Sequence, residues 1–471
     1  MSQASARPCA ALTLSKCPFR AVSPCVSACT TEQPRTSKTM KATFCWLLIV
    51  GGLLWGCDLN VANPNQAFEE QVLTTSDGIK ALAIGMQRSY ASNNVDAYVR
   101  HPAITSRELA ANTTFSNLLE LEDGLAALSG SNSAIGSIWS RSYRVMGMAN
   151  DLIANAPEVP LAAGTRSGIM ALAHLYKAKC LGFVAQAFAH APIDVQADGQ
   201  APFRPREELF AAAIGSLDRA LETATSTPPS DEFNADILGE GFDLINTIRA
   251  YRARYHLFTG NYQAALDAAD AVDPAATSVY MYDAENENPL YAQVVVADDY
   301  APRDHFGLSS TESGDARLAF YTAPSERTSN PNDFPIEDLA GFWHSATSPI
   351  PAYLPGEMAL TRAEAHAMLG NIDAAIAEID AVRTKTPADD PYGVGAALPP
   401  YSGLQSLEAV LNEIFRQRRA ELFLHGTGWE DSRRLGQPGP SADMFERNRD
   451  FYPYADQERL NNSNTPADPA Q

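Results

Sequence analysis

A repeated segment of 21 residues constrains the fold of this chain more than any other feature of its sequence. Arg252–Val272 and Arg362–Val382 are offset by 110 positions, and ten of their 21 positions are identical: Arg, Ala, His, Gly, Asn, Ala, Ala, Asp, Ala and Val. In both copies a Gly-Asn pair separates two stretches whose apolar residues recur every three or four positions. Each copy is therefore expected to form a helix, a tight turn and a second helix.

The turn and the helix after it carry further signals. Gly260 and Gly370 can adopt the left-handed conformation that ends a helix. Small residues follow each turn and let the second helix approach the first closely: Ala264, Ala265, Ala374 and Ala375. This is the tetratricopeptide pattern of antiparallel helix pairs. The alternative, two unrelated alanine-rich hairpins, is weakened by the shared Gly-Asn turn. Because the copies are not contiguous, a long solenoid is not expected.

The rest of the mature chain is predicted to be mainly α-helical, with one exception. Apolar periodicity extends through 172–187, 244–258 and 407–414, so helical hairpins are expected over about 135–272 and about 355–435. The segment of about 275–350 is instead rich in Tyr, Asn, Ser, Asp and Pro. It is predicted to form a loop-rich insertion with short strands, and long structured loops on a rigid scaffold usually carry function.

The N-terminal region indicates export. Residues 40–57 read MKATFCWLLIVGGLLWGC, with one lysine, a short apolar run and a final cysteine. This is the layout of a lipoprotein signal peptide over 40–56, with lipidation expected at Cys57. A plain signal peptide with a chance cysteine is the alternative. Residues 1–39 show no hydrophobic periodicity and are interpreted as a miscalled N-terminal extension, which leaves 57–471 as the working domain.

Charge and cysteine content exclude several classes of protein. The chain has a net charge of −21, and because residues 1–56 carry six Lys/Arg and one Glu, the remainder has a charge of −26. Such an acidic chain repels phosphate backbones, so nucleic-acid binding is not expected. Only Cys57 and Cys180 lie in the mature part, and lipidation of Cys57 leaves no pair for a disulfide and no set for a cysteine zinc site.

The sequence contains no recognisable catalytic motif. G-x-x-x-x-G-K-[ST], H-E-x-x-H, G-x-S-x-G and the calcium-loop pattern are all absent. The aromatic residues are more informative, because sugars stack their C–H faces on rings and pair their hydroxyls with amides and charges. Two regions have this mixture, 98–117 and 280–343. The candidate ligand-binding residues from them are Asn112, Phe115, Tyr280, Tyr282, Tyr300 and Trp343. For any single ring, the alternative to ligand binding is a structural role in which the ring packs a loop onto the helices.

Several segments resemble the SusD/RagB family of outer-membrane nutrient-binding lipoproteins of the Bacteroidetes type. The residues that carry the resemblance extend over nearly all of the mature chain: Trp139–Tyr143, 178–192, Asp315-Ala316-Arg317, Glu357–Arg383, Glu413–Leu435 and Asn448–Asn461. Two positions depart from the family pattern, since Ala316 replaces a proline and Leu354-Pro355-Gly356 stands where an arginine is common.

The resemblance implies a SusD-like fold and a role in nutrient uptake. Such a protein is anchored by lipid at the surface of the outer membrane and caps a TonB-dependent SusC-like barrel. It captures an oligosaccharide or peptide and delivers it to the barrel as a hinged lid, with no bond broken and no cofactor or metal required. A surface-tethered glycoside hydrolase and a tetratricopeptide scaffold for proteins are the alternatives.

The motifs of this resemblance that lie closest to the C-terminus indicate a structural role rather than catalysis. Their charged residues are spaced to form an ion-pair network, and the predicted members are Glu413, Arg418, Arg419, Glu421, Asp431 and Arg434.

Overall fold

The computed structural model describes residues 72–196, 198–435 and 437–470, which belong to one compact unit. The proposed extension over 1–39, the signal peptide over 40–56 and Cys57 lie outside the described residues. No helix in the described part of the chain combines the length and the hydropathy needed to span a membrane.

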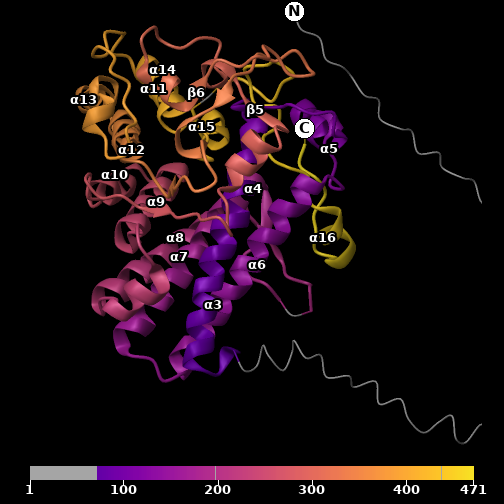
Figure 1. The fold of residues 1–471 in the computed structure, drawn as a ribbon, viewed down its shortest axis with the longest axis vertical. Coiled ribbons are helices and arrows are strands. Elements are labelled where there is room, and N and C mark those ends of the chain that lie inside the picture. The colour runs from indigo at the N-terminus through magenta and orange to yellow at the C-terminus, as the bar shows by residue number, and fades with distance from the viewer. Residues whose placement is uncertain (1–71, 197, 436, 471) are drawn as a thin grey trace, which may run out of the picture. The chain divides into compact units, whose positions relative to one another are not determined.

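The described chain is mainly helical, and the longest stretch with few helices lies between α10 and α12 (Figure 1). The α-helices are α3 (Ser76–Ser89), α4 (Val95–Thr105), α5 (Ser116–Asp123), α6 (Ser133–Asn155), α7 (Ala163–Ala187), α8 (Arg206–Ser226), α9 (Leu244–Phe258), α10 (Tyr262–Asp270), α11 (Ala316–Tyr321), α12 (Pro355–Met368), α13 (Ile372–Thr384), α14 (Leu407–Glu421), α15 (Gly428–Arg434) and α16 (Asp456–Asn461). Short π-helical segments occur at Tyr90–Asn94, Phe233–Leu238 and Tyr291–Val296.

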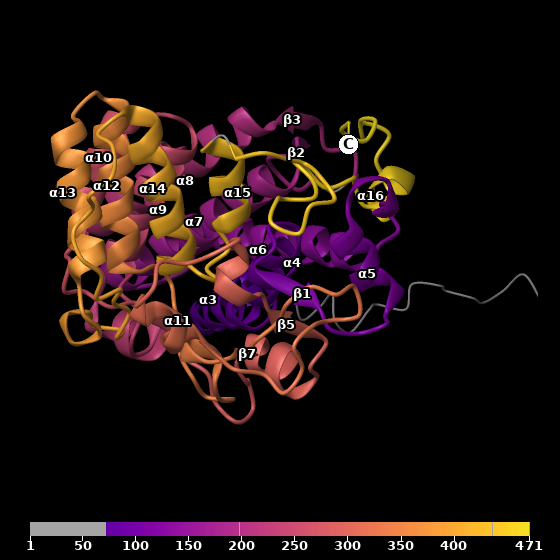
Figure 2. The same ribbon diagram turned by 90° about the horizontal axis from the view of Figure 1, so that it is seen from above.

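The two copies of the repeat form the helical hairpins α9–α10 and α12–α13. Gly260 and Gly370 have φ angles of 72° and 85°, in the left-handed region that glycine adopts without strain. The N–H groups of Asn261 and Asn371 then donate to the carbonyls of His256 and His366 at 2.9 and 2.8 Å, which closes the end of the first helix. Helix α10 packs against α12, so the hairpins stack directly (Figure 2).

The N-terminal helices continue the same arrangement. Helix α7 packs most extensively against α8 and is also covered by α6, so nearly its whole length is buried. Its uniform burial explains why apolar residues occur all around it rather than on one face. Helix α3 packs against α6, and α14 packs against α12 and α13 at the other end of the series.

The strands in the described part of the chain are short and occur as four antiparallel pairs. The pairs are β1 (Leu109–Ala111) with β5 (Tyr300–Pro302), β2 (His190–Pro192) with β3 (Phe203–Pro205), β4 (Val279–Tyr280) with β8 (Ile350–Pro351), and β6 (Thr322–Ala323) with β7 (Asp338–Leu339). The β4–β8 pair joins the two ends of the segment between α10 and α12, so this segment is a closed insertion in the helical scaffold.

The predicted fold class, a mainly α tetratricopeptide-like scaffold with a loop-rich insertion and short strands, is confirmed. The insertion also holds the short helix α11, which the sequence analysis did not predict. Its start is fixed by Asp315, whose carboxylate accepts a hydrogen bond from the Arg317 N–H at 3.1 Å. Six residues are too few to show a helical period.

Candidate functional site

The β1–β5 pair brings the two aromatic-rich regions of the sequence together. Ala111 pairs with Tyr300, although 189 positions separate them. Just beyond the pair, the Asn112 N–H donates to the Asp299 carbonyl at 2.8 Å, and the Asn112 side chain donates to the backbone and carboxylate oxygens of Asp298 at 3.0 and 2.8 Å. A residue from the first region is thus fixed against the insertion.

The two segments that meet at this contact also carry exposed groups. Phe115, which precedes α5, is 57% exposed and offers a free aromatic ring. Arg327 donates to Asp298 at 2.6 Å, and the side chains of both residues are nearly half exposed. We call Asn112, Phe115, Asp298 and Arg327 the β1–β5 surface. It offers a ring, an amide, a carboxylate and a guanidinium to a polar ligand.

A buried carboxylate connects the two segments that carry this surface. Glu122 accepts hydrogen bonds from the Ala111 N–H at 2.7 Å and from the side-chain amide of Asn330 at 3.0 Å. Asn332 donates a third bond, and Asn330 also donates to the Ala111 carbonyl at 2.9 Å. Burial raises the pKa of Glu122 despite these hydrogen bonds. The insertion loop that contains Arg327 is therefore tied to β1 rather than free.

The other four candidate ligand residues lie in the interior. Tyr300 is buried, and its hydroxyl accepts from the Arg100 guanidinium, which lies 4.5 Å from the ring centroid. Tyr282 donates to the Ala91 carbonyl at 3.0 Å, and Trp343 is fully buried with its ring stacked on Tyr321. The contacts of Tyr282 and Tyr300 pack the insertion onto the helices, and the Trp343 stack lies within the insertion. The assignment of these rings to a ligand site stays a prediction.

Tyr280 contributes to an unusual buried contact. It is buried, and its hydroxyl accepts from the ammonium of Lys179 in α7. The Lys179 nitrogen lies 4.3 to 5.3 Å from the ring centroids of four tyrosines: Tyr90, Tyr176, Tyr251 and Tyr280. Burial lowers the pKa of Lys179 well below its ordinary value. The rings thus hold the end of β4 against the helices.

The sequence analysis missed Asp298 and Arg327. Neither residue belongs to a motif or to a periodic segment, and both are separated from Asn112 by more than 180 positions. Only the pairing of β1 with β5 and the Asp298–Arg327 contact place them beside Asn112. No signal in a single sequence points to such a short pairing.

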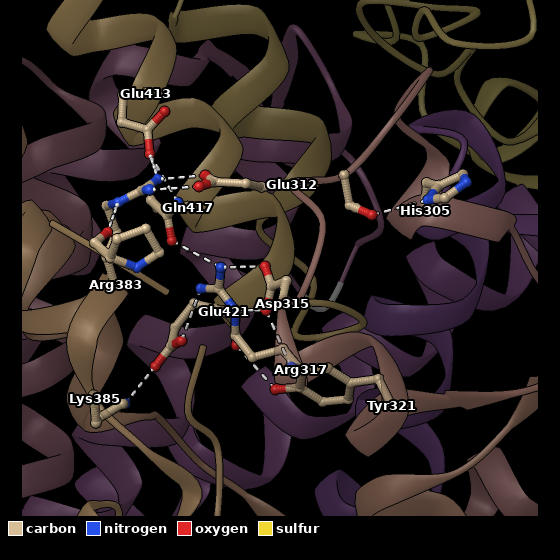
Figure 3. Close-up of polar contacts among 12 residues, drawn as sticks. His305, Glu312, Asp315, Arg317, Tyr321, Arg383, Lys385, Glu413, Gln417 and Glu421 are labelled. Atoms are coloured by element: carbon tan, nitrogen blue, oxygen red, sulfur yellow. Dashed lines mark hydrogen bonds and ion pairs between the residues drawn. The ribbon is translucent and has the colours of Figure 1, made fainter. Parts of the chain in front are cut away.

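Two of the predicted network residues meet partners from α11 and the α12–α13 hairpin (Figure 3). Glu421 pairs with Arg317 at 3.1 Å and with Lys385 at 2.6 Å. Burial lowers the pKa of Arg317, but its contacts with Asp315 and Glu421 outweigh that effect and raise it. Gln417 accepts from Arg317 at 2.8 Å and donates to Glu413 at 2.9 Å, which links both acids into one chain of contacts.

The other four predicted network residues form two separate groups. Asp431 forms an ion pair with Arg418 at 2.9 Å and accepts a hydrogen bond from Arg434 at 2.7 Å, and Arg434 also pairs with Glu364 of α12. Arg419 instead lies 3.8 Å from Glu108 and donates to the carbonyl of Phe306 at 2.7 Å. The six residues therefore divide among three clusters that fasten α14 to different neighbours.

A polar cavity of about 330 Å³ lies beside the cluster of Figure 3. Its carboxylates are those of Glu312, Asp315 and Glu413, and each is paired with an arginine. Fully paired carboxylates of this kind suit a structural role. Among the described residues, no group of three or more His, Cys, Asp or Glu side chains is arranged to hold a metal ion.

The comparisons with known proteins agree with this architecture. Residues 345–469 match the model of the SusD family. A SusD-like carbohydrate binding protein from Bacteroides vulgatus is 17% identical with a TM-score of 0.64, and the match covers 83% of this chain and 97% of that one. A SusD superfamily protein from Bacteroides thetaiotaomicron is 16% identical with a TM-score of 0.65, and the match covers 84% of this chain and 100% of that one. A SusD-like carbohydrate binding protein from Bacteroides fragilis is 12% identical with a TM-score of 0.64, and the match covers 84% of this chain and 100% of that one.

The fold is thus that of SusD-like proteins. No curated protein sequence matches the chain. The three motif blocks closest to the C-terminus lie within residues 345–469, so this part of the chain has the sequence features of the SusD family.

Proposed function

We propose that this protein binds oligosaccharides, or peptides as the second candidate cargo, at the β1–β5 surface. The observation that carries the proposal is the convergence of Asn112 and Phe115 with Asp298 and Arg327 on a fold shared with SusD-like carbohydrate binding proteins. An exposed ring receives the C–H face of a sugar, while amide, carboxylate and guanidinium groups hydrogen-bond its hydroxyls. No bond of the ligand is broken, and no cofactor takes part.

The same proposal includes transport. Lipidation at Cys57 would tether the domain of 57–471 to the outer membrane, with the protein exposed at the cell surface. There it would act as the lid of a TonB-dependent SusC-like barrel and deliver its ligand for uptake. Support comes from the match of residues 345–469 to the SusD family model and from the N-terminal sequence pattern.

Binding is tested by isothermal titration calorimetry with a defined panel. The panel consists of maltotriose, cellotriose, xylotriose, mannotriose, tri-galacturonate and tetra-alanine. Phe115→Ala is expected to weaken binding of the accepted ligand at least tenfold, because it removes the exposed ring without opening the core. Leu404→Ala is the matched control, since Leu404 is also strongly exposed but lies before α14, and it should leave affinity unchanged.

The outcomes separate the parts of the proposal. If no panel member binds the wild-type protein, the binding function is contradicted. If a ligand binds but Phe115→Ala and Asn112→Ala leave its affinity unchanged, the function stands and the β1–β5 surface is the wrong site. Release of shorter products from a bound oligosaccharide would contradict the non-catalytic role.

The transport part has its own test. A C-terminally tagged protein is purified from native outer membranes, and its partners are identified by mass spectrometry. A TonB-dependent barrel is expected in a near one-to-one amount. Its absence from a preparation in which the protein is intact and membrane-bound would contradict the transport role.

A further inference from the structure

A second cavity lies on a different part of the molecule, between α6, the connection from β2 to β3, and α16. Its volume is about 240 Å³. Its walls include Trp139 and Tyr143 from α6, Gln196 from the connection, and Gln457, Glu458 and Asn461 from α16. None of these residues belongs to the β1–β5 surface. Figure 1 shows α16 beside α6, as the contacts between the two helices require.

Hydrogen bonds fix all three walls to one another. The Trp139 indole N–H donates to the Glu458 carboxylate at 3.1 Å, which joins α6 to α16. Tyr143 donates to the Pro192 carbonyl at 2.8 Å, which joins α6 to the end of β2. Asn462 donates to the Ala201 carbonyl and to Glu458, both at 2.8 Å. The cavity is therefore preformed, and a ligand would not have to order its walls.

The inner wall is aromatic. The ring centroids of Trp139 and Tyr143 lie 5.0 Å apart with the planes inclined by 43°, so the two rings form an angled surface. Phe188 at 4.9 Å and Phe203 at 5.8 Å support the indole from other sides. Trp139 is 7% exposed and Tyr143 is half-buried, so only part of this surface is open. Such a surface suits the C–H face of a single sugar ring.

The rim is polar and carries no positive charge. Ser140, Gln196, Gln457 and Asn461 are exposed and offer hydroxyl and amide groups. Asp194 and Glu458 are the charged residues of the lining, and the nearby Lys177 is paired with Asp194. Hydroxyl groups can pair with every one of these side chains, whereas a carboxylate or phosphate would face like charges. The lining therefore disfavours an anionic ligand and accommodates a neutral one.

We propose that this cavity is a second binding site, which holds one neutral glycosyl unit. Its volume is below the roughly 300 Å³ at which sites for drug-sized ligands begin, so it suits one sugar ring rather than a long chain. The inference rests on the proposed oligosaccharide-binding function and extends it. A polymer that engages the β1–β5 surface and this cavity at once would be retained more strongly than by either site.

Fluorine NMR of the 5-fluorotryptophan-labelled protein tests the cavity directly. Trp139 lines the cavity, whereas Trp343 and Trp429 are buried elsewhere and serve as internal references. The Trp139 resonance is assigned by its loss in Trp139→Phe. The probes are maltotriose, cellotriose, xylotriose and mannotriose, with tri-galacturonate as the acidic counterpart. A neutral probe is expected to shift the Trp139 resonance and leave the references unchanged.

A pair of matched variants closes the cavity or leaves it open. Gly136 lies on α6 in the cavity wall, and a Cβ added there meets no atom within 4 Å. Gly147 lies on the same helix, has the same free space and is not part of the lining. Gly136→Phe fills the cavity without removing a core atom, and Gly147→Phe makes the same change outside it. We expect at least a tenfold loss of the Trp139 response in the first variant only.

Each result decides between the two proposals. A neutral probe that binds by calorimetry, leaves the Trp139 resonance unshifted and binds Gly136→Phe unchanged would overturn the second site while the proposed function stands. If no saccharide binds the wild-type protein, both are overturned. A shift with tri-galacturonate as large as that with the neutral probes would overturn the selectivity for neutral ligands.

Discussion

At the scale of single residues, the interior contains charges that are held by arginine. Glu430 of α15 is fully buried, accepts from Arg206 at 2.8 Å and also pairs with Arg433. Burial alone would raise the pKa of Glu430, but the charges of Arg433 and Arg206 outweigh it and lower the pKa to about 2. The ionised carboxylate thus joins α15 to the start of α8.

The variant Glu430→Gln tests this contact. The pKa of Glu430 is lower in the folded state than the ordinary value of 4.5, so its contribution is complete above pH 4.5 and disappears as the pH falls toward 2. The variant should lower the free energy of unfolding at pH 7 by on the order of 3 kcal/mol, partly because two partly buried arginines lose their counter-charge. Urea denaturation measures the loss.

The control is Glu312→Gln, because the Glu312 carboxylate also pairs with an arginine but is 44% exposed. Exposed pairs contribute roughly 0 to 1 kcal/mol, so its effect should be much smaller. Equal losses in the two variants would show that burial does not determine the strength of the Glu430 contact.

At the scale of elements, the hairpins and the strand pairs differ in how they are encoded. The α9–α10 and α12–α13 hairpins could be predicted because their turns need glycine and because apolar residues repeat along both helices. The β1–β5 pair could not be predicted, since strands of three residues show no period and their partners lie far apart in the sequence. Asn112 and Phe115 could therefore be proposed from their chemistry, whereas nothing in the sequence connects Asp298 and Arg327 with them.

The burial of Tyr300 and Trp343 has a related cause. Both residues occur in the aromatic-rich insertion, where a ring that binds a ligand and a ring that packs onto a helix look the same in sequence. The structure gives Tyr300 a partner in α4 and Trp343 a partner in α11. Only the tertiary contacts of Tyr300 and Trp343 separate these buried rings from the exposed ring of Phe115.

The turn of the second hairpin gives a prediction at this scale. Gly370 has a φ angle of 85°, and a Cβ there meets no atom within 4 Å, so Gly370→Ala changes backbone strain alone. We expect a loss of about 1 kcal/mol in the free energy of unfolding. Gly215→Ala is the matched control, since Gly215 has equal free space inside α8, where alanine should stabilise by about 0.5 to 1 kcal/mol. Thermal denaturation should therefore show a lower melting temperature for Gly370→Ala and a higher one for Gly215→Ala. Changes of the same sign in both variants would contradict the need for glycine in the turn.

At the scale of the whole molecule, several histidines are buried in the neutral state. Burial lowers the pKa of His101 to about 3, and burial together with nearby cations lowers the pKa values of His174 and His425, each to about 4. In the unfolded chain each histidine takes up a proton near pH 6.5. The folded state therefore loses stability as the pH falls from about 6.5 toward these values. Glu108 and Glu122, whose pKa values burial raises, oppose part of this loss.

The variant His174→Asn isolates one such contribution. His174 lies in α7, and its Nδ1 atom is 3.3 Å from the Ser216 hydroxyl of α8, a contact that an asparagine amide can replace. With pKa values of about 4 folded and 6.5 unfolded, this histidine should account for about 2 kcal/mol of the stability lost between pH 7 and pH 5. Urea denaturation at both pH values should show that loss reduced by this amount in the variant. A loss equal to that of the wild type would show that His174 is protonated in the folded protein, and would assign the acid sensitivity to other groups.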